Sequence, residues 1–498
     1  MAQTERDAFD KPGQYNLTEL AILSYRQNKE ESLPNRMDIK GITFNFEIAE
    51  DILTNNVVGS VIVYDMQDVR TLMPLTGLER ISIKFNSPGI KGYDYSEDTG
   101  IPLQIYKVDK VKRDPDTDGG QLYQIFFCSP EMYKNSTTRV SRAYAGPVEN
   151  GVIDIVKNYL KSEKPIYVEP TSTNAKYVIP NLKPYQAINY LCSQAKSGKF
   201  KNNAGYVFYE TSKGFYFRSI ASMMGLGGQL TEIPPKWKFS SIVTSVTENQ
   251  KQPEIKDVER RLSSVIRYEF EKPIDMLDNI NSGFYANRVI VHDAFNKTIT
   301  TTDFDYIDIG TQQPHTEMST SRFDRRVGLL YPENGEGKGV PFADTNKGLN
   351  EQPLSKLMVT TETSKVHNDY EFTPTKETLP LITNQRATMR NMNLSLLVYG
   401  NTLINAGDII TFTSPIMRPT GHNEEVVNSP YTSGRYIILA IKHTVNVEAQ
   451  RHEMVLKCYK DSVRSAYPTE SEALSSVGKG NFKEFNLYEE QLKDFQSA

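Results

Sequence analysis

One acidic segment has the residue types of a calcium-binding loop. In Asp114-Pro-Asp-Thr-Asp-Gly119, carboxylates occupy alternate positions and a glycine follows, as in the first half of an EF-hand loop. The twelfth position of such a loop supplies a bidentate glutamate, but here it is Ile125, within an apolar alternating run. We therefore interpret the segment as an acidic hairpin turn and predict no metal site.

Other chemical motifs are partial or absent. Gly225-Leu-Gly-Gly228 lacks the GxGxxG spacing, and a polar, proline-containing segment follows it instead of a phosphate-binding helix. His452-Glu-Met-Val-Leu456 lacks the second histidine of a zinc protease, and the chain contains no GxxxxGK[ST], HExxH or GxSxG motif. No local pattern singles out two of the 61 acidic residues as a glycosidase pair. The sequence thus indicates no catalytic residue and no cofactor.

The histidines and cysteines are scattered along the chain. Of the six histidines, His443 and His452 are the pair whose positions allow them to meet across adjacent strands, and a hydrogen-bonded strand histidine is the preferred interpretation. The cysteines Cys128, Cys192 and Cys458 are odd in number, far apart and set in apolar stretches. We expect buried free thiols rather than disulfides or metal ligands.

Composition limits the class of protein. A chain of 498 residues is too long for one hydrophobic core, which predicts two to four domains. The 57 basic and 61 acidic residues give a net charge of -4, which disfavours sequence-specific DNA binding. No apolar run is long enough to cross a bilayer, and Met1 to Gln14 has no signal-peptide pattern. We expect a protein that is folded in the cytoplasm.

Short alternating strands dominate the first part of the chain, separated by Gly, Pro, Asn and Asp clusters. This pattern predicts a sandwich or small barrel over residues 41–130, after an N-terminal extension over 1–40. The clearest strands are Ile42-Thr-Phe-Asn-Phe-Glu-Ile48, Ser60-Val-Ile-Val-Tyr64, Ile81-Ser-Ile-Lys-Phe85, Leu103-Gln-Ile-Tyr-Lys-Val108 and Leu122-Tyr-Gln-Ile-Phe-Phe127.

The period then changes to that of helices, which predicts an inserted α+β domain over 145–235. Val152, Ile155, Val156, Tyr159 and Leu160 share one face of a first helix. Pro184 opens a second helix, because the missing proline donor costs nothing in a first turn, and Ile188, Leu191, Cys192 and Ala195 form its apolar stripe. A hairpin follows, with strands at 205–210 and 215–220.

The remaining chain alternates between strands and polar segments. Residues 239–308 read mostly as strands, and we expect part of them to complete the first β-domain. Residues 309–388 read as a linker with a long exposed loop near Gly335. Residues 389–462 predict a second small barrel. Residues 463–498 predict a polar linker, beginning near Ala466, and a short helix.

Several segments together resemble the baseplate hub family of contractile-tailed phages, the relatives of the T-even hub. They are spread over about residues 42–462, and they are specific jointly rather than singly. The segments are Glu50-Asp-Ile, Gly59-Ser-Val-Ile-Val, Pro74-Leu-Thr-Gly-Leu-Glu-Arg-Ile-Ser-Ile-Lys-Phe85, Pro184-Tyr-Gln-Ala-Ile-Asn-Tyr-Leu191, residues 205–220, Gly283-Phe-Tyr-Ala-Asn-Arg-Val-Ile290, Phe304-Asp-Tyr306, Gly400-Asn-Thr, Ala406-Gly-Asp-Ile-Ile, Ser433-Gly-Arg-Tyr-Ile-Ile and Lys460-Asp-Ser462.

The resemblance implies a mainly β fold with an α insertion, in which two tail-tube-like barrels accompany an inserted domain and extended loops. It implies a non-enzymatic homotrimer in the virion baseplate, assembled in the host bacterial cytoplasm, that adapts a hexameric tail tube to a trimeric central spike. The implied partners are the spike, the tail tube or tube-initiator protein, the tape measure protein and the wedge proteins. DNA would pass through the lumen without specific binding, which suits a slightly acidic chain.

Two segments are predicted to face partners. The first is an expected edge strand with Leu394, Leu396 and Val398. The second is the apolar face of the C-terminal helix, with Leu487, Tyr488, Leu492 and Phe495. Three alternatives to a phage hub stay open from sequence. They are a peripheral or receptor-binding baseplate protein, the hub of a bacterial contractile injection system, and a tail-associated cell-wall hydrolase.

Overall fold

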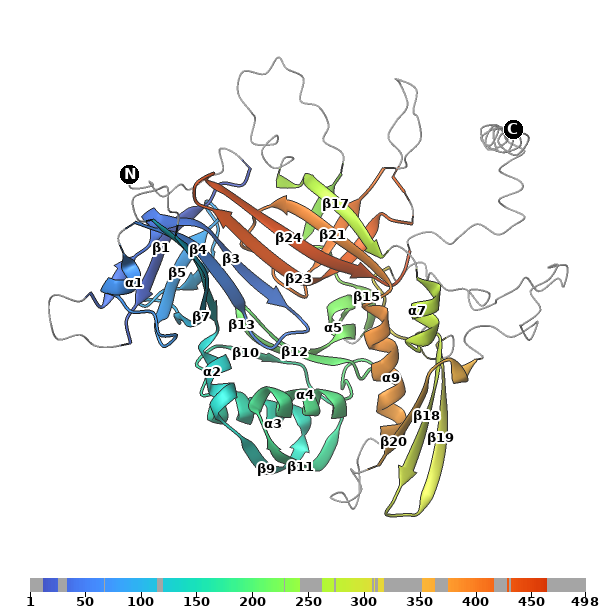
Figure 1. Cartoon of the computed structure of the whole chain (residues 1–498). Helices are drawn as coiled ribbons and strands as arrows, with labels where there is room; N and C mark the ends of the chain where they lie inside the picture. Colours follow the sequence, from blue (N-terminus) through green and yellow to red (C-terminus); the bar gives the residue numbers. More distant parts are fainter. Residues whose placement is uncertain are drawn as a thin grey trace, which may run out of the picture.

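The structure is a computed structural model that describes residues 12–25, 34–66, 68–113, 120–227, 229–241, 262–272, 275–306, 309, 312–317, 352–362, 375–415, 428–429 and 431–463. The fold is mainly β with several helices, as the sequence predicts. Figure 1 shows two β-units side by side along the top, the inserted domain below them, and a small sheet with a long helix at one side.

The first β-unit is built from the N-terminal part of the chain. Its sheet order is β3-β4-β8-β7-β5-β1-β2, and β6 pairs with β5. Alternate residues of these strands point inward and form a core that includes Phe46, Phe85 and Phe127. The elements are β1 (Asn16–Leu23), β2 (Arg36–Asp38), the 3-10 turn η1 (Lys40–Ile42), β3 (Thr43–Asp51), β4 (Val58–Asp65), α1 (Val69–Leu72), β5 (Arg80–Asn86), β6 (Tyr93–Tyr95), β7 (Leu103–Arg113) and β8 (Gln121–Cys128).

The second β-unit combines two segments that are far apart in sequence. Its order is β17-β21-β24-β23-β22-β16. Its core contains Leu396, Phe412 and Leu456. The elements are β16 (Trp237–Ser240), β17 (Val265–Lys272), β21 (Met392–Tyr399), β22 (Ile409–Thr413), β23 (Gly434–Asn446) and β24 (Arg451–Lys460).

The two β-units have the same topology. Matching β3, β4, β8, β7, β5 and β1 in order with β17, β21, β24, β23, β22 and β16 reproduces the strand order of the second unit, and only β2 and β6 of the first unit have no described counterpart. In both units the chain just before the first strand of this path bonds to the last strand, through Ile39 N to Leu20 O in one and Ser240 N to Ser263 O in the other. These bonds bring the two ends of each sheet together, so each unit is a small barrel. One pairing differs, since β1–β5 is antiparallel and β16–β22 is parallel.

Two β-bulges also occupy matching positions in the two barrels. The β3–β4 ladder shifts between Thr43 and Asn45, and the β17–β21 ladder shifts between Val265 and Arg267. The β7–β8 and β23–β24 ladders shift at Ile105/Lys107 and Ile438/Ala440. Since bulges fix strand twist and register, their coincidence marks the two barrels as copies of one architecture.

The inserted domain lies between the barrels in sequence and beneath them in Figure 1. The helical patterns are confirmed: the first helix runs through α3 into a π-helical turn, and Pro184 opens the second. Ile188 and Leu191 on α4 are fully buried. The elements are α2 (Pro130–Thr137), β9 (Val140–Pro147), α3 (Val148–Asp154), η2 (Ile155–Tyr159), β10 (Ile166–Val168), β11 (Asn174–Leu182), α4 (Pro184–Gln194), the hairpin β12 (Tyr206–Thr211) and β13 (Gly214–Ser219), α5 (Ile220–Met224), β14 (Gly225–Leu226) and β15 (Gln229–Glu232).

A fourth group consists of a three-stranded sheet and its helices. Strand β18 lies between β19 and β20, and α9 covers one face of this sheet (Figure 1). Phe284, Phe304 and Leu381 share its core. The elements are α7 (Met276–Asn281), β18 (Ala286–Asp293), β19 (Thr298–Asp305), the 3-10 turn η4 (Pro353–Ser355), β20 (Leu357–Thr361) and α9 (Thr375–Thr388).

Three boundaries expected from sequence are corrected. Residues 1–40 are not only an extension, because β1 and β2 belong to the first barrel. No described strand from 239–308 completes the first barrel: β16 and β17 join the second, and β18 and β19 form the separate sheet. The range 309–388 is not all linker, because it contains β20 and α9. For the strands, pairing decides the assignment, and residue periodicity does not encode it.

Candidate assembly interfaces

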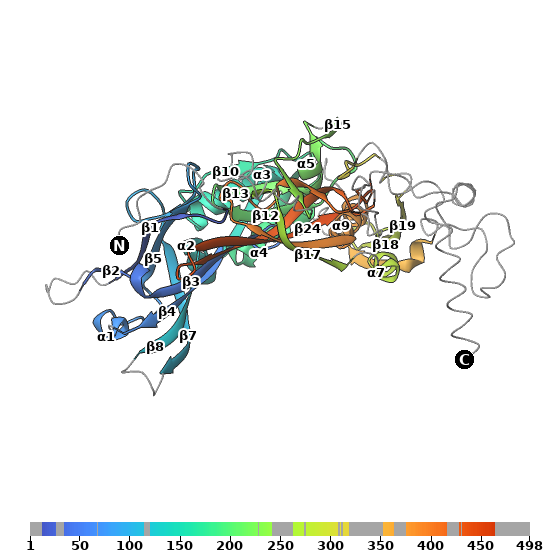
Figure 2. The same cartoon turned by 90° about the horizontal axis from the view of Figure 1, so that it is seen from above.

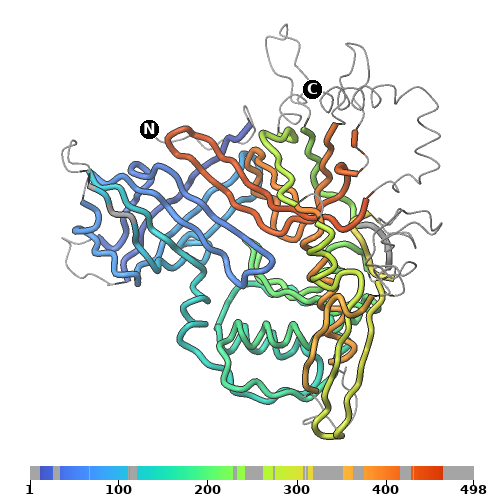
Figure 3. Tube along the Cα trace, turned by 45° about the vertical axis from the view of Figure 1, so that its right-hand side comes forward, coloured from blue at the N-terminus to red at the C-terminus, as the bar shows by residue number. Residues whose placement is uncertain are grey.

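The two barrels are joined edge to edge into one continuous sheet. Strand β23 of the second barrel pairs antiparallel with β3 of the first, from Ala440 opposite Asp51 to Asn446 opposite Asn45. Figure 3 follows this sheet across both barrels. Val445 of β23 is fully buried and belongs to the core of the first barrel. We call this pairing the internal joint, and it shows that one barrel's edge strand can complete the sheet of another.

A buried polar cluster closes one side of the internal joint. Tyr93 on β6 donates a hydrogen bond to Glu50 on β3 (2.9 Å), and its hydroxyl also lies 3.0 Å from His443 Nε2 on β23. His443 Nδ1 in turn lies 3.0 Å from His452 Nε2 on β24. The sequence prediction that this histidine pair meets across adjacent strands is therefore confirmed. The cluster connects the first barrel to the second through side chains as well as backbone.

Glu50 also receives backbone donors from two other parts of the chain. Ser212 N, in the turn of the inserted hairpin, donates to Glu50 Oε1 (2.7 Å), and Ala406 N donates to Oε2 (3.2 Å). Burial raises the pKa of Glu50 to about 7, although these hydrogen bonds oppose the shift. Burial lowers the pKa of His443 far below its usual value and that of His452 to about 3. Both imidazoles are thus neutral in the folded chain near neutral pH.

A second buried cluster joins the inserted domain to the first barrel. The Lys164 ammonium lies 2.8 Å from Glu131 on α2 and 2.6 Å from Glu210 on β12. Val57 N, just before β4, donates to Glu210 (3.0 Å). Burial lowers the pKa of Lys164 less than the two carboxylates raise it, so its pKa is raised. Burial outweighs the ammonium at Glu210, whose pKa is raised. At Glu131 burial also raises the pKa, but the ammonium together with hydrogen bonds from Ser162 and the backbone lowers it overall.

A histidine–aspartate pair near the end of β24 has the geometry of the orienting half of a catalytic triad. His315 Nδ1 lies 2.7 Å from Asp461 Oδ2. Burial raises the pKa of Asp461, but His315 and the hydrogen bonds from Thr316 overcome it and hold the pKa at about 2. In a triad the second ring nitrogen faces the nucleophile, whereas here His315 Nε2 faces the buried Tyr306 hydroxyl at 3.4 Å. The pair therefore fixes the start of the C-terminal segment to the fourth group.

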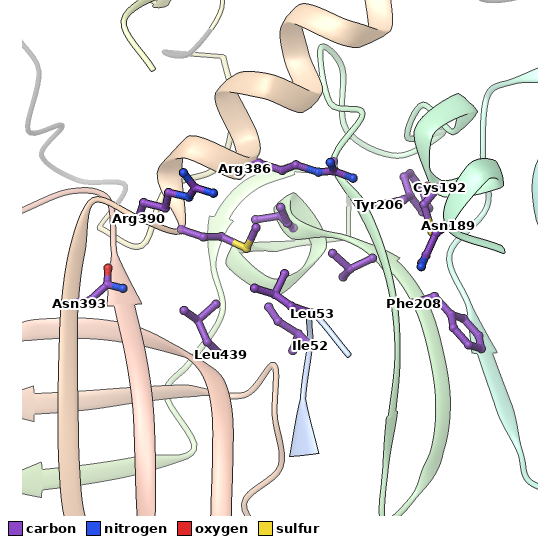
Figure 4. Close-up of a pocket in the computed structure, with 14 residues that line it drawn as sticks. Ile52, Leu53, Asn189, Cys192, Tyr206, Phe208, Arg386, Arg390, Asn393 and Leu439 are labelled. Carbon is purple, nitrogen blue, oxygen red and sulfur yellow. The ribbon is translucent and has the colours of Figure 1, made fainter. Parts of the chain in front are cut away.

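One pocket lies where the second barrel, the inserted domain and α9 meet (Figure 4). Its volume is about 480 Å³. Arg386 comes from the last turn of α9 and Arg390 from the chain just after this helix. Ile52 comes from the chain just after β3, Leu439 from β23 and Phe208 from β12. Its lining is mostly apolar with two cationic side chains, and no ligand class follows from these residues alone.

No assembled metal or membrane site is found in the described ranges. There, no group of three or more His, Cys, Asp or Glu residues is arranged to hold a metal ion. No helix in the same ranges is long and apolar enough to span a membrane. The three cysteines are buried and free, as predicted. The acidic segment at Asp114, the loop near Gly335 and the chain beyond 463 lie outside the described residues.

The structure corrects the first of the two predicted partner-facing segments. Leu394, Leu396 and Val398 on β21 are at most 1% exposed and lie in the core of the second barrel. Strand β21 is not an edge, because β17 and β24 pair with its two sides. Alternating apolar residues identify the buried face of a strand but not its neighbours, which explains the error. The second segment, with Leu487, Tyr488, Leu492 and Phe495, lies outside the described residues.

Sequence reasoning missed the edges that are open in the described chain. Strand β17 pairs with β21 on one side, and no described strand pairs with its other side along 266–272. Strand β7 pairs with β8 throughout, but β5 reaches only Leu103 and Gln104. Figure 2 shows the β7–β8 hairpin reaching beyond the rest of the first barrel. The alternation of charged and apolar residues in Val265–Lys272 was the available signal for an edge strand.

Solved tail proteins are similar to this chain over most of its length. A tail protein from Neisseria meningitidis MC58 has 7% sequence identity and a TM-score of 0.47, with coverage of 91% of this chain and 100% of that chain. The 43 kDa tail protein of prophage MuSo2 from Shewanella oneidensis has 9% identity and a TM-score of 0.48, with coverage of 89% and 99%.

A third similar structure comes from a secretion system. It is the E. coli c3393 protein, described as a component of the type VI secretion system with structural similarity to the T4 tail proteins gp27 and gp5. Its identity is 8% and its TM-score 0.35, with coverage of 92% of this chain and 80% of that chain. At such identities and scores, the likeness assigns no function by itself. No protein-family model and no curated protein sequence matches the chain.

Proposed function

We propose that this chain is a structural hub of a contractile phage tail, located in the virion baseplate. Three copies would form a ring of six barrels that adapts a hexameric tail tube to a trimeric central spike and surrounds part of the DNA conduit. The observation that carries this proposal is the internal joint, in which two barrels of the same topology complete one sheet within a single chain.

The two open edges in the described chain, along β17 and along the distal part of β7, support assembly from such units. An edge strand that lacks a partner is a liability for a soluble chain, and ring closure is a common way to cover it. The joint is heterologous, since β23 of one barrel meets β3 of the other, and heterologous contacts produce rings when the rotation closes. The number of chains in the ring, three, is what the sequence resemblance implies.

The buried clusters support a structural rather than a catalytic role. Glu50, Lys164 and Asp461 each connect different parts of the chain, and all three side chains are satisfied by internal partners. On this proposal the protein is not an enzyme. Its partners are the spike, the tail tube or its initiator, the tape measure protein and the wedge proteins, and it contacts DNA without specific binding.

A second candidate keeps the same geometry. The hub of a bacterial contractile injection system would need the same two barrels, and the joint does not distinguish the two machines. The internal joint disfavours a peripheral or receptor-binding protein, because such a protein has no need for two barrels of one topology joined edge to edge.

Electron microscopy of particles formed by the purified chain tests the proposal. We expect rings with a central lumen and three copies of the inserted domain around it, formed by the chain alone or on adding a trimeric central spike protein. Particles the size of one chain, with and without the spike protein, would contradict the proposal.

A further inference from the structure

Each open edge corresponds to a strand that is paired at the internal joint. Strand β17 occupies in the second barrel the place of β3 in the first, and β7 occupies the place of β23. The first half of β23 pairs with β22, and its second half, from Ala440 to Asn446, pairs with β3. Strand β7 likewise pairs with β5 only at its start. The distal part of β7 and the outer side of β17 are thus the two halves of a second joint.

We propose that β7 of one chain pairs antiparallel with β17 of a second copy of this chain, in the register of the internal joint. This inference rests on the proposed function and names the residues that would carry its ring. Each copy uses β7 toward one neighbour and β17 toward the other, so the contact is heterologous and repeats around the ring.

The shared bulges fix the register in β7. The third residue from the bulge is Asp109 in β7 and Lys442 in β23, counted from Lys107 and Ala440. Beyond Asp109, β7 has one additional residue relative to β8, and Lys112 stands opposite Leu122. In the second barrel the equivalent position is Thr444, which stands opposite Glu453. Lys112 is therefore the counterpart of Thr444.

The same counting fixes the register in β17. Glu269 is the third residue from the Val265/Arg267 shift, as Glu47 is the third from the Thr43/Asn45 shift. After a further shift, Lys272 takes the place of Ala49. At the internal joint Lys442 stands opposite Ala49 and Thr444 opposite Glu47. The second joint therefore places Asp109 opposite Lys272 and Lys112 opposite Glu269.

Charge agrees with this register at both positions. Asp109 would meet Lys272 and Lys112 would meet Glu269, so each cross-strand pair combines opposite charges, an arrangement that stabilises adjacent strands. Within the single chain Asp109 also pairs with Lys107, and Lys272 also pairs with Asp278, so the Lys112–Glu269 pair is the more informative of the two. A slip by one residue would turn the side chains of one strand to the opposite face and remove both pairs. Lys112 and Glu269 are exposed in the single chain, where they are available to a neighbour.

Cysteine cross-linking of the full chain tests the register. In Lys112→Cys/Glu269→Cys, the two Cα atoms would lie opposite each other across the joint, within disulfide reach. We expect mild oxidation to convert most of the chain into species larger than one chain. The matched control is Lys112→Cys/Arg267→Cys, because Arg267 is also exposed but lies two residues before Glu269 in β17. We expect it to remain uncross-linked.

The outcomes separate this inference from the proposed function. A chain that light scattering shows to be oligomeric but that does not cross-link through positions 112 and 269 overturns the register and leaves the hub proposal standing. A chain that stays monomeric and uncross-linked at high concentration overturns both. Equal cross-linking of the test and control pairs also overturns the register.

Charge reversal provides a second measurement that needs no oxidation. In Glu269→Lys, every joint would oppose two cations, and we expect self-association to weaken about fivefold per joint. Lys112→Glu/Glu269→Lys restores opposite charges, and we expect it to regain most of the loss. A double variant as weak as the single one would overturn the pairing of these two residues.

Discussion

Glu47 on β3 and Lys442 on β23 form an ion pair across the internal joint, with 3.1 Å between carboxylate oxygen and ammonium nitrogen. Both side chains are partly exposed, so the pair contributes little free energy. The strand pairing beneath it and the burial of Val445 in the first barrel supply most of the stability of the joint. The ion pair is therefore a marker of the register in which β3 and β23 pair.

The first prediction concerns this ion pair. Glu47→Lys should lower the free energy of unfolding by about 0.5–1 kcal/mol, because it opposes two cations at a partly exposed site. Glu47→Lys/Lys442→Glu should recover most of that loss. Urea unfolding of the wild type, Glu47→Lys, Lys442→Glu and the double variant forms a double-mutant cycle. A coupling energy of zero would mean that the pair does not form in solution.

The second prediction concerns the buried histidines. The folded pKa of His452 is about 3, below its usual value of 6.5, so the unfolded chain binds more protons as pH falls below about 6.5. Stability should therefore fall with pH between about 6.5 and 3, by up to 1.4 kcal/mol per pH unit for this residue. His452→Gln should reduce that slope in urea titrations. The control His292→Gln, at an exposed position on β18, should not.

The third prediction concerns Glu50 and has the opposite sign. Its folded pKa is about 7 and its usual value is 4.5, so the fold favours the protonated carboxyl. Its contribution is complete below about pH 4.5 and is lost as pH rises through 7, by at most 1.4 kcal/mol per unit. In Glu50→Gln, stability should rise more steeply with pH between 5 and 7 than in the wild type. An unchanged slope would contradict the shifted pKa.

The fourth prediction concerns Lys164. Lys164→Met removes the cation between two buried carboxylates and should cost about 3–5 kcal/mol. Adding Glu131→Gln and Glu210→Gln should recover much of the loss, because the uncompensated charges are then removed. Thermal unfolding checks this series, with Lys157→Met, at an exposed position, as the control. A loss in Lys164→Met no larger than in the control would exclude a buried ionic link between the inserted domain and the first barrel.

The fifth prediction concerns packing at the internal joint. A Cβ on Gly400 would lie 2.1 Å from the His452 ring. Gly400→Ala should therefore cost about 1–3 kcal/mol, since the buried ring must move. Gly41→Ala is the matched control, because no atom lies within 4 Å of its added Cβ. Denaturant midpoints of the two variants should differ clearly, and equal midpoints would contradict the packing around His452.

Local elements were predictable from sequence because their signals are local. Period-two alternation identified β3, and Pro184 with its apolar stripe identified α4. The meeting of His443 and His452 followed from placing both on adjacent strands.

Pairings between distant strands were not predictable in this way. The pattern around Leu396 indicates one buried face equally for a central and an edge strand, so β21 was misassigned. Helix α9 was missed because its sequence is polar and contains Pro380. The internal joint joins residues about 400 positions apart, such as Phe46 and Val445, and only the assembled fold reveals it.

The most direct test of the central claim is the mass of the purified chain in solution, measured by light scattering after size exclusion at several concentrations, with and without a trimeric central spike protein. The hub account predicts particles of three chains, formed alone or on adding that spike. A mass of one chain at every concentration, unchanged by the spike, would contradict it.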